Sequence, residues 1–210
     1  MRRKPDPGAL DFVRPLPRAS VSLVAGRGHY ETVIEAVLGA ELSVWIATAN
    51  LKELMIEDAR AAPGVRRGKA RYRSVLAALD ELAGRGVELR VLHAELPSGP
   101  FRREFDRHPR LIGGGLELAT CPRVHLKVVI VDGRLAYLGS ANWTGAGLGA
   151  KGTGRRNFEL GLISDDPLLL DEVQAVYQRI WSGGECKGCK LRAACPGPLD
   201  STSRPRAPRR

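Results

Sequence analysis

One short stretch of the chain, HLKVVIVDGRLAYLGSAN from His125 to Asn142, combines histidine, lysine, serine and asparagine side chains. An imidazole can attack phosphorus or transfer a proton, and a lysine can neutralise charge on a phosphate. Hydroxyl and amide groups can donate hydrogen bonds to phosphate oxygens. The residue types of this stretch therefore point to chemistry on a phosphate ester.

These residues need a scaffold, and the sequence around them predicts a β-hairpin. Two apolar runs, residues 126–131 and 135–138, flank Asp132-Gly133, a dipeptide that favours a tight hairpin turn. Because side chains alternate along a strand, we expect His125 and Lys127 to project together, on the face opposite Leu126, Val128 and Ile130. A potential nucleophile and a fixed cation would then stand side by side.

The residues after the return strand complete a recognisable pattern. Gly139 allows close backbone approach to a ligand, and Ser140 and Asn142 offer hydrogen-bond donors. HxKxxxxD from His125 to Asp132, followed by GSxN, resembles the signature of the phospholipase D superfamily. Asn142-Trp143-Thr144 and Asn157-Phe158-Glu159 are similar to its later Asn-x-Thr and Asn-x-Glu positions, and the likeness covers roughly residues 20–182.

The resemblance implies a metal-independent phosphodiesterase that forms a covalent phosphohistidine. Such enzymes use two facing motifs, and this chain has one, which implies a homodimer with its site at the two-fold interface. Lys127 and Asn142 would hold the phosphate oxygens, and Glu159 would bind the far nitrogen of His125. For Asp132, the first residue of the turn, the alternative to a catalytic role is a purely structural one. The predicted catalytic residues are His125, Lys127, Asp132, Ser140, Asn142 and Glu159. The predicted substrate-binding residues are Gly139, Thr144, Lys151, Arg155, Arg156 and Asn157.

The charge of the chain favours a polyanionic partner. The net charge is +10 and the isoelectric point about 9.9, so we expect nucleic acid, DNA rather than RNA. Part of this charge lies in Arg-rich segments at residues 1–18 and 197–210, which we expect to be disordered and which could simply aid solubility. The Gly-rich loop 151–156 directly follows the motif and is predicted to contact phosphate.

Two other basic segments are open to two interpretations each. The long connection 52–73 would be either a mobile loop that grips substrate or a solvated insertion. It holds Arg60, Arg66, Arg67, Lys69, Arg71 and Arg73. In residues 101–108, Phe101 and Phe105 could stack on bases or belong to the core of an amphipathic helix, and we favour the core.

Four cysteines form a separate candidate site. Cys186, Cys189 and Cys195 follow a Cys-x2-Cys-x5-Cys pattern near the C-terminus, and Cys121 is the fourth cysteine of the chain. This arrangement is similar to the iron–sulfur staple of certain CRISPR-associated and recombination-repair nucleases. We expect a structural [4Fe–4S] cluster, with zinc as the first alternative and free or redox-active thiols as the second. No catalytic metal is expected.

The remaining pattern predicts an α/β fold with a mixed sheet flanked by helices. Predicted strands span residues 20–24, 43–49, 87–92 and 158–163, and predicted helices span 30–38 and 75–83, with another from Asp166-Pro167 to Gly183-Gly184.

We expect a basic N-terminal segment at 1–18, a catalytic domain at 19–184, the cysteine staple at 185–196 and a basic tail at 197–210. No apolar run is long enough to cross a bilayer, and no signal peptide is recognisable, so a cytoplasmic protein is expected.

Three function classes remain open from the sequence. The first is a nuclease acting on DNA, which the charge and the basic loops favour. The second is a phospholipid hydrolase or transphosphatidylase, which the absence of an amphipathic membrane-binding face disfavours. The third is a nucleic-acid-binding module with a degenerate site, which the complete motif disfavours.

Overall fold

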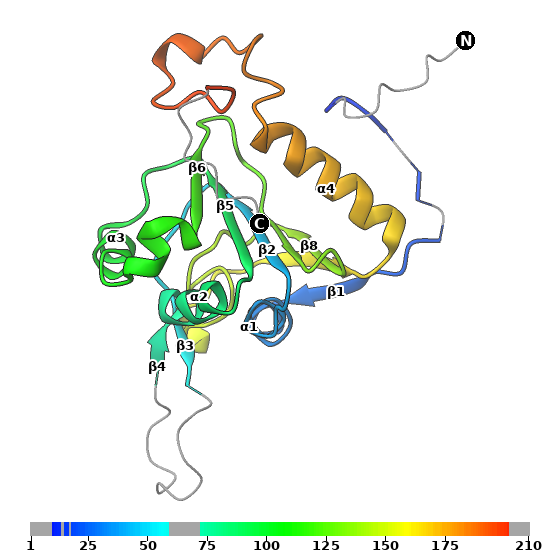
Figure 1. Cartoon of the computed structure of the whole chain (residues 1–210). Helices are drawn as coiled ribbons and strands as arrows, with labels where there is room; N and C mark the ends of the chain where they lie inside the picture. Colours follow the sequence, from blue (N-terminus) through cyan, green and yellow to red (C-terminus); the bar gives the residue numbers. More distant parts are fainter. Residues whose placement is uncertain (1–9, 14, 17, 59–71, 202–210) are drawn as a thin grey trace, which may run out of the picture.

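A mixed β-sheet forms the centre of the protein in the computed structural model, which describes residues 10–13, 15–16, 18–58 and 72–201. Its strands are β1 (Ser22–Ala25), β2 (Ser43–Thr48), β5 (Glu88–His93), β6 (Glu117–Thr120), β7 (Val128–Val131), β8 (Leu135–Gly139) and β9 (Leu160–Ser164). They lie in the order β1-β9-β8-β7-β2-β5-β6 (Figure 1). Strands β2, β5 and β6 are parallel, and the other neighbours are antiparallel. The predicted α/β class with a mixed sheet is confirmed.

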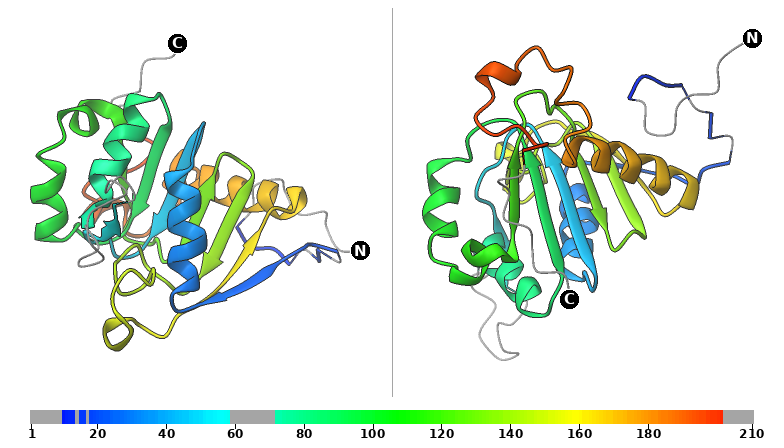
Figure 2. Two further views of the ribbon diagram at one scale, coloured as in Figure 1. Left: turned by 90° about the horizontal axis from the view of Figure 1, so that it is seen from below. Right: turned by 45° about the horizontal axis from the view of Figure 1, so that its top comes forward.

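Helices cover both faces of this sheet. The helices are α1 (Glu35–Leu38), which continues a π-helical turn over Tyr30–Ile34, α2 (Val75–Gly84), α3 (Gly99–Phe105) and α4 (Pro167–Trp181). Helices α1 and α2 lie on one face and α4 lies on the other (Figure 2). A hydrophobic core lies on each face of the sheet, and strand β7 contributes side chains to both. Val129 and Val131 belong to the core beneath α1 and α2, and Val128 and Ile130 belong to the core beneath α4.

Two helices begin at the residues that their capping chemistry favours. The Ser74 hydroxyl accepts a 2.9 Å hydrogen bond from the Leu76 N–H at the start of α2. The Asp166 carboxylate accepts hydrogen bonds from the backbone N–H groups of Leu168 and Leu169, and Pro167 occupies the first turn of α4. Each cap satisfies backbone donors that have no partner within the helix.

The predicted hairpin is present as β7 and β8. The Arg134 N–H donates to the Val131 carbonyl at 2.9 Å, and the two residues between them, Asp132 and Gly133, have φ values of 54° and 64°. Positive φ at both central positions defines the turn type whose twist suits a hairpin. Strand β7 begins at Val128, two residues later than the sequence suggested, so His125 and Lys127 lie in the extended segment that leads into it.

The described ends of the long connection at 52–73 pair with each other in a second, small sheet. Strand β3 (Met55–Glu57) pairs with β4 (Tyr72–Ser74). Arg73 pairs with Glu81 at 2.9 Å and lies 4.0 Å from Asp58, so this arginine is engaged within the protein. The other basic residues of the predicted gripping loop, Arg60, Arg66, Arg67, Lys69 and Arg71, lie outside the described residues.

Phe101 is buried and stacks on Phe105, with ring centroids 6.2 Å apart, and both pack in the core as predicted. Within the described ranges, no helix is both long and apolar enough to traverse a lipid bilayer.

Candidate active site

The candidate active site lies at one edge of the sheet. Strands β2, β5, β6 and β8 end at this edge, and β7 and β9 begin there, as the pairing registers require. The residues that immediately precede or follow these strand ends therefore converge from distant parts of the chain. All the predicted catalytic residues except Asp132 belong to this group of strand ends.

His125 and Lys127 enter this edge from the start of β7. The His125 side chain is exposed, and the Lys127 Nζ donates a 2.8 Å hydrogen bond to the His125 backbone carbonyl. Partial burial lowers the pKa of Lys127, and the nearby Glu159 carboxylate opposes this shift. Leu126 packs beneath α4 with Val128 and Ile130, which confirms the predicted alternation. The imidazole is therefore accessible beside a cation that its own backbone helps to position.

Asn142 is held by residues at the end of β2. Its side-chain carbonyl accepts hydrogen bonds from the Thr48 hydroxyl and from the Asn50 N–H, both at 3.2 Å. The same Thr48 oxygen accepts a 3.0 Å hydrogen bond from the Trp143 N–H, and its single proton is shared between Asn142 and the Asn50 carbonyl, which lies 2.9 Å away. Because the amide carbonyl is occupied on the protein side, the amide NH₂ of Asn142 is oriented as the donor toward the site.

Ser140, Asn157 and Glu159 form a hydrogen-bonded group next to Lys127. The Ser140 hydroxyl donates to one oxygen of the Glu159 carboxylate, and the Asn157 amide donates to the other at 3.0 Å. The sequence resemblance predicted that the Glu159 carboxylate accepts a hydrogen bond from the far nitrogen of His125. In the part of the chain that the structure describes, no such hydrogen bond is formed, and both carboxylate oxygens have these other partners. Glu159 thus orients Ser140 and Asn157 within one chain.

Gly139 has a packing reason for being glycine. Its partner across β8 and β9 is Gly161, and the Tyr137 ring lies over both positions. A Cβ atom at Gly139 or at Gly161 would overlap the Tyr137 side chain. Burial raises the pKa of Tyr137 to about 12, and its hydroxyl accepts a 3.3 Å hydrogen bond from the Ala141 N–H. The glycine that the sequence assigned to ligand approach is thus required by a buried tyrosine.

Asp132 lies at the opposite end of β7 from His125, after Val131. Its carboxylate accepts hydrogen bonds from the backbone N–H groups of Glu41, Leu42 and Ser43, at 3.0, 2.7 and 2.8 Å. Burial alone would raise the pKa of Asp132, but these three N–H donors lower it below the ordinary value. The geometry supports the architectural alternative, in which Asp132 fixes the connection into β2.

A cavity of about 270 Å³ adjoins the candidate catalytic residues. Its polar lining residues are Asn50, Lys52, Glu53, Asn142, Thr144, Lys151 and Asn157. Burial raises the pKa of Glu53 to about 7, although Ser74 opposes the shift, and the Glu104 carboxylate raises it further. The sequence predicted Thr144, Lys151 and Asn157 as substrate-binding residues, and the structure brings them to this cavity. Lys52 and Lys151 supply positive charge there.

The other predicted phosphate contacts are Arg155 and Arg156. They lie between Lys151 and Asn157 in the sequence, but they are not among the residues that line this cavity. Arg155 ends a short 3-10 turn over Thr153–Arg155 and is exposed. Arg156 donates a 2.6 Å hydrogen bond to the Thr153 hydroxyl. The sequence analysis did not identify three polar residues near the site, Thr48, Asn50 and Glu53. Their position directly after the mainly apolar run 43–47 could have indicated that they lie at the end of a strand.

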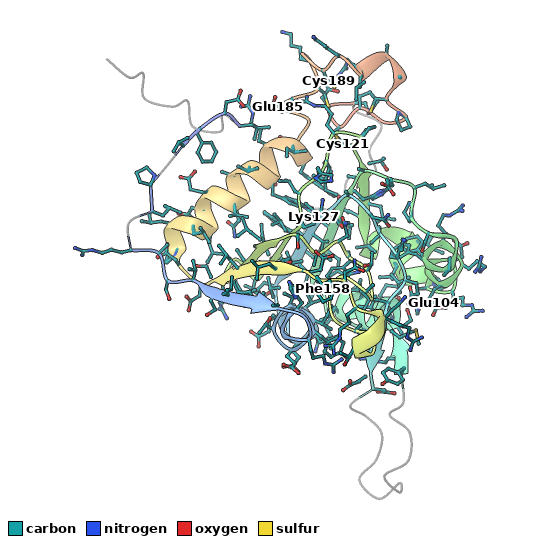
Figure 3. The ribbon with its side chains drawn as sticks, turned by 180° about the vertical axis from the view of Figure 1, so that it is seen from behind. Glu104, Cys121, Lys127, Phe158, Glu185 and Cys189 are labelled. Carbon is teal, nitrogen blue, oxygen red and sulfur yellow. The ribbon has the colours of Figure 1, made fainter. Side chains whose placement is uncertain are left out.

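All four cysteines line one further cavity, of about 110 Å³, and none forms a disulfide. Cys121 follows β6, and its N–H donates to the His93 carbonyl at 2.8 Å. Burial raises the pKa of the Cys121 thiol, and its proximity to Cys186, Cys195 and Cys189 raises it further. Figure 3 shows Cys121 directly beneath the C-terminal segment that carries Cys189. The structure therefore brings the predicted cysteine set together.

The chain matches a family model and is similar in fold to several solved structures. Residues 34–181 match the family described as "Cardiolipin synthase, PLD-like domain". NucT from Helicobacter pylori has a similar structure, with a TM-score of 0.54 and 18% identity over 77% of this chain and 95% of that one. Nuc from Salmonella typhimurium, a phospholipase D family member, has a TM-score of 0.54 and 20% identity over 78% and 95%.

A third similar structure is phosphatidylserine synthase from Haemophilus influenzae. Its TM-score is 0.51, with 20% identity over 80% of this chain and 40% of that one. At these identities the likeness concerns the fold. No curated protein sequence is significantly similar to this chain.

Proposed function

Because the chain belongs to the family of phospholipase D-like domains, which are phosphodiesterases, we propose that it hydrolyses phosphodiester bonds in DNA through a covalent phosphohistidine. The observation that carries this proposal is the convergence of His125, Lys127 and Asn142 at one edge of the sheet. An exposed imidazole, a cation and an oriented amide donor are the groups that an attack on phosphorus requires.

In the first step, an imidazole nitrogen of His125 forms a bond to phosphorus as the bond to the leaving oxygen breaks. The His125 of a second chain donates a proton to that oxygen. In the second step, this second imidazole removes a proton from water, and the resulting hydroxide displaces the phosphoryl group from His125. The products are an alcohol and a phosphate monoester, and both imidazoles regain their starting states.

Lys127 and Asn142 would stabilise the transition state through the non-bridging oxygens. The charge on these oxygens grows as the nucleophile approaches, and pre-positioned donors stabilise it without reorganising. Asn142 is pre-positioned by Thr48, and Lys127 by the His125 carbonyl. We propose that these two side chains replace the catalytic metal ions that many phosphoryl-transfer enzymes use.

An apolar surface next to the site supports the proposed homodimer. Phe158 is fully exposed, and Leu160 and Leu162 follow it on the same side of β9, with Leu23 opposite Leu162 on β1. Leu23 is 68% exposed and Leu160 is 55% exposed. We call Leu23, Phe158, Leu160 and Leu162 the β9 patch. It adjoins Glu159, which lies between Phe158 and Leu160 in the sequence, so a second copy bound there would bring its own site residues close to the first.

The choice of DNA rests on charge. The chain carries a net charge of +10, and Lys52 and Lys151 line the cavity beside the catalytic residues. A positively charged cavity attracts phosphate backbones because binding releases condensed counterions. A phospholipid is the second candidate, because the matched family is described by a cardiolipin synthase and the β9 patch is apolar.

The experiment is a comparison of substrates in excess chelator. Purified protein and the His125→Ala variant are incubated with single- and double-stranded DNA, RNA, and phosphatidylcholine–cardiolipin vesicles in the presence of EDTA. We expect the wild type to hydrolyse DNA fastest and the variant to be inactive. Hydrolysis of phospholipid alone would overturn the choice of substrate, and activity only after magnesium is added would overturn the mechanism.

A further inference from the structure

The four cysteines at the cavity described above are all the cysteines of the chain. Cys121 comes from the end of β6, whereas Cys186, Cys189 and Cys195 come from the segment after α4. The cavity between them is otherwise lined mainly by apolar side chains, including Val124, Ile180 and Leu199. Thiols from two distant parts of the chain therefore converge on one small, largely apolar space.

The C-terminal segment has little else to hold it. Among residues 184–201, only Leu199 is buried. Two ion pairs, Arg179 with Glu185 and Arg192 with Asp200, both at 2.7 Å, lie at the surface, where such pairs contribute about 0–1 kcal/mol. A short segment with so little buried apolar area usually needs a metal or a disulfide to fold. The thiols are the groups in this segment that could provide such a link.

The backbone of the segment presents the thiols in sequence. The Cys189 N–H donates to the Cys186 carbonyl at 3.2 Å, and the Cys195 N–H donates to the Arg192 carbonyl at the same distance. These turns carry three cysteines past the end of α4 and back toward Cys121. The C-terminal end of the segment then returns to the helix, since a Cβ atom at Gly183 would overlap the backbone of Leu199 and Asp200.

We propose that Cys121, Cys186, Cys189 and Cys195 bind one [4Fe–4S] cluster through their four thiolates. The four sulfurs around a single zinc ion, at about 2.3 Å from the metal, lie within about 4 Å of one another. The thiolates of a four-iron cluster each bind a different iron and stand farther apart. Within the described part of the chain, no three His, Cys, Asp or Glu side chains are arranged to hold one metal ion.

Four thiolates are the ligand set of a [4Fe–4S] cluster, and all four cysteines line this one cavity. Prolines directly after Cys121 and Cys195 agree with this assignment, because a Cys-Pro ligand is frequent in ferredoxin-type sites. Lys187, Lys190 and Arg192 lie between the ligands in sequence and would offset the negative charge of the bound thiolates. The four thiols lose their protons when the cluster binds.

Such a cluster would act as a staple for the proposed active site. Cys121 precedes His125 by four residues, so the cluster would fix the segment that leads into β7 and tie it to the end of α4. Hydrolysis of a phosphodiester moves no electrons. The cluster therefore holds structure, and the oxidised and reduced proteins should hydrolyse substrate at equal rates.

The test is made on protein purified without oxygen. We expect about four iron and four sulfide per chain, a broad absorbance in the visible range, and an electron paramagnetic resonance signal after reduction. Each Cys→Ser variant at the four positions should lose most of the iron. The matched control is Ala194→Ser, which adds a hydroxyl at an exposed position beside Cys195 and should keep the full iron content.

A second measurement covers the case in which the variants do not fold. Wild-type protein is treated with an oxidant and a chelator, and trypsin cleavage after Lys187, Lys190 and Arg192 is followed by mass spectrometry. We expect rapid cleavage after treatment and protection before it. One zinc per chain, or metal-free protein with an equally protected C-terminal segment, would overturn the proposal. Neither readout depends on catalysis, so a failure here is distinct from a failure of the proposed function.

Discussion

The Thr48 hydroxyl donates a 3.2 Å hydrogen bond to the side-chain carbonyl of Asn142 and accepts the N–H of Trp143 at 3.0 Å. This buried threonine belongs to β2, far in sequence from the motif that it supports. It fixes the direction in which the Asn142 amide can donate.

Replacing Thr48 by valine should therefore lower kcat without removing any group that touches substrate. We expect a loss of about 10- to 100-fold, because a displaced donor stabilises the transition state poorly. The free energy of unfolding should also fall by about 1–3 kcal/mol, since the Trp143 N–H loses its partner. Thr48→Ser keeps the hydroxyl and should retain most activity. A valine variant with normal kcat would show that Asn142 needs no support from β2.

Asp132 should contribute to stability and have little direct effect on the reaction. Its carboxylate accepts three backbone N–H groups at the end of β7 distant from His125. Asp132→Ala leaves these donors unpaired and places alanine at a positive φ, so we expect a loss of about 2–4 kcal/mol of stability with kcat of the folded protein unchanged. Asp132→Asn, which accepts one donor and tolerates this φ, should be intermediate.

The pH dependence of this contribution follows from the lowered pKa of Asp132. A carboxylate that is more acidic in the folded state stabilises the protein above its unfolded pKa, and the contribution disappears as pH falls through the folded value. The stability difference between the wild type and Asp132→Ala should therefore shrink below about pH 4. Thermal unfolding measured between pH 3 and pH 7 tests this. A large loss of kcat in Asp132→Asn would restore its catalytic assignment.

The sequence predicted much of the fold from local signals. Asp132-Gly133 predicted the hairpin because its turn needs two residues that tolerate positive φ, and both are found there. The short strands β3 and β6 were missed, since they carry only three or four residues and lack a clear alternation. His125, Lys127 and Asn142 were identified by their types and spacing, and the structure brings them to one edge.

The contacts that hold the site residues in place could not be predicted from the sequence, and the reason is physical. Thr48 and Asn142, like Asp132 and Ser43, meet only because antiparallel pairing joins β2 to β7. No spacing rule connects residues so far apart. Likewise, Gly139 was assigned to the ligand, because the sequence does not show that the Tyr137 side chain lies back along β8 over this position.

Glu53 should make stability depend on pH in the opposite sense to Asp132. Burial raises the pKa of Glu53 to about 7, so the folded state retains a proton that the unfolded chain loses near pH 4.5. Stability should fall as pH rises from about 4.5 to 7, because the ionised carboxylate is partly buried. Glu53→Gln should raise the melting temperature at pH 8 and have little effect at pH 4.

The control is Asp171→Asn, which neutralises an exposed carboxylate on α4 and should leave the melting temperature unchanged at both pH values. Equal effects of Glu53→Gln at pH 4 and pH 8 would show that folding does not raise the pKa of Glu53. The comparison requires only differential scanning fluorimetry at several pH values.

Mixing of chains tests the shared site. If every site needs His125 from two chains, a threefold excess of His125→Ala chains should reduce the activity of each wild-type chain to about one quarter after exchange of subunits. The control chain combines His125→Ala with Leu162→Asp, which places a charge in the β9 patch and should no longer associate. It should leave wild-type activity intact. Unchanged activity with the His125→Ala chain itself would indicate a site complete within one chain.

Covalent phosphorylation of His125 during turnover can be detected directly. Wild-type protein is mixed with DNA in EDTA, quenched in alkali within the first turnover, digested, and analysed by mass spectrometry without exposure to acid. We predict a phosphoryl adduct, carrying the nucleic-acid fragment, on the peptide that contains His125, and its absence in His125→Asn. Rapid turnover in EDTA with no adduct on His125 at any quench time would rule out a covalent phosphohistidine.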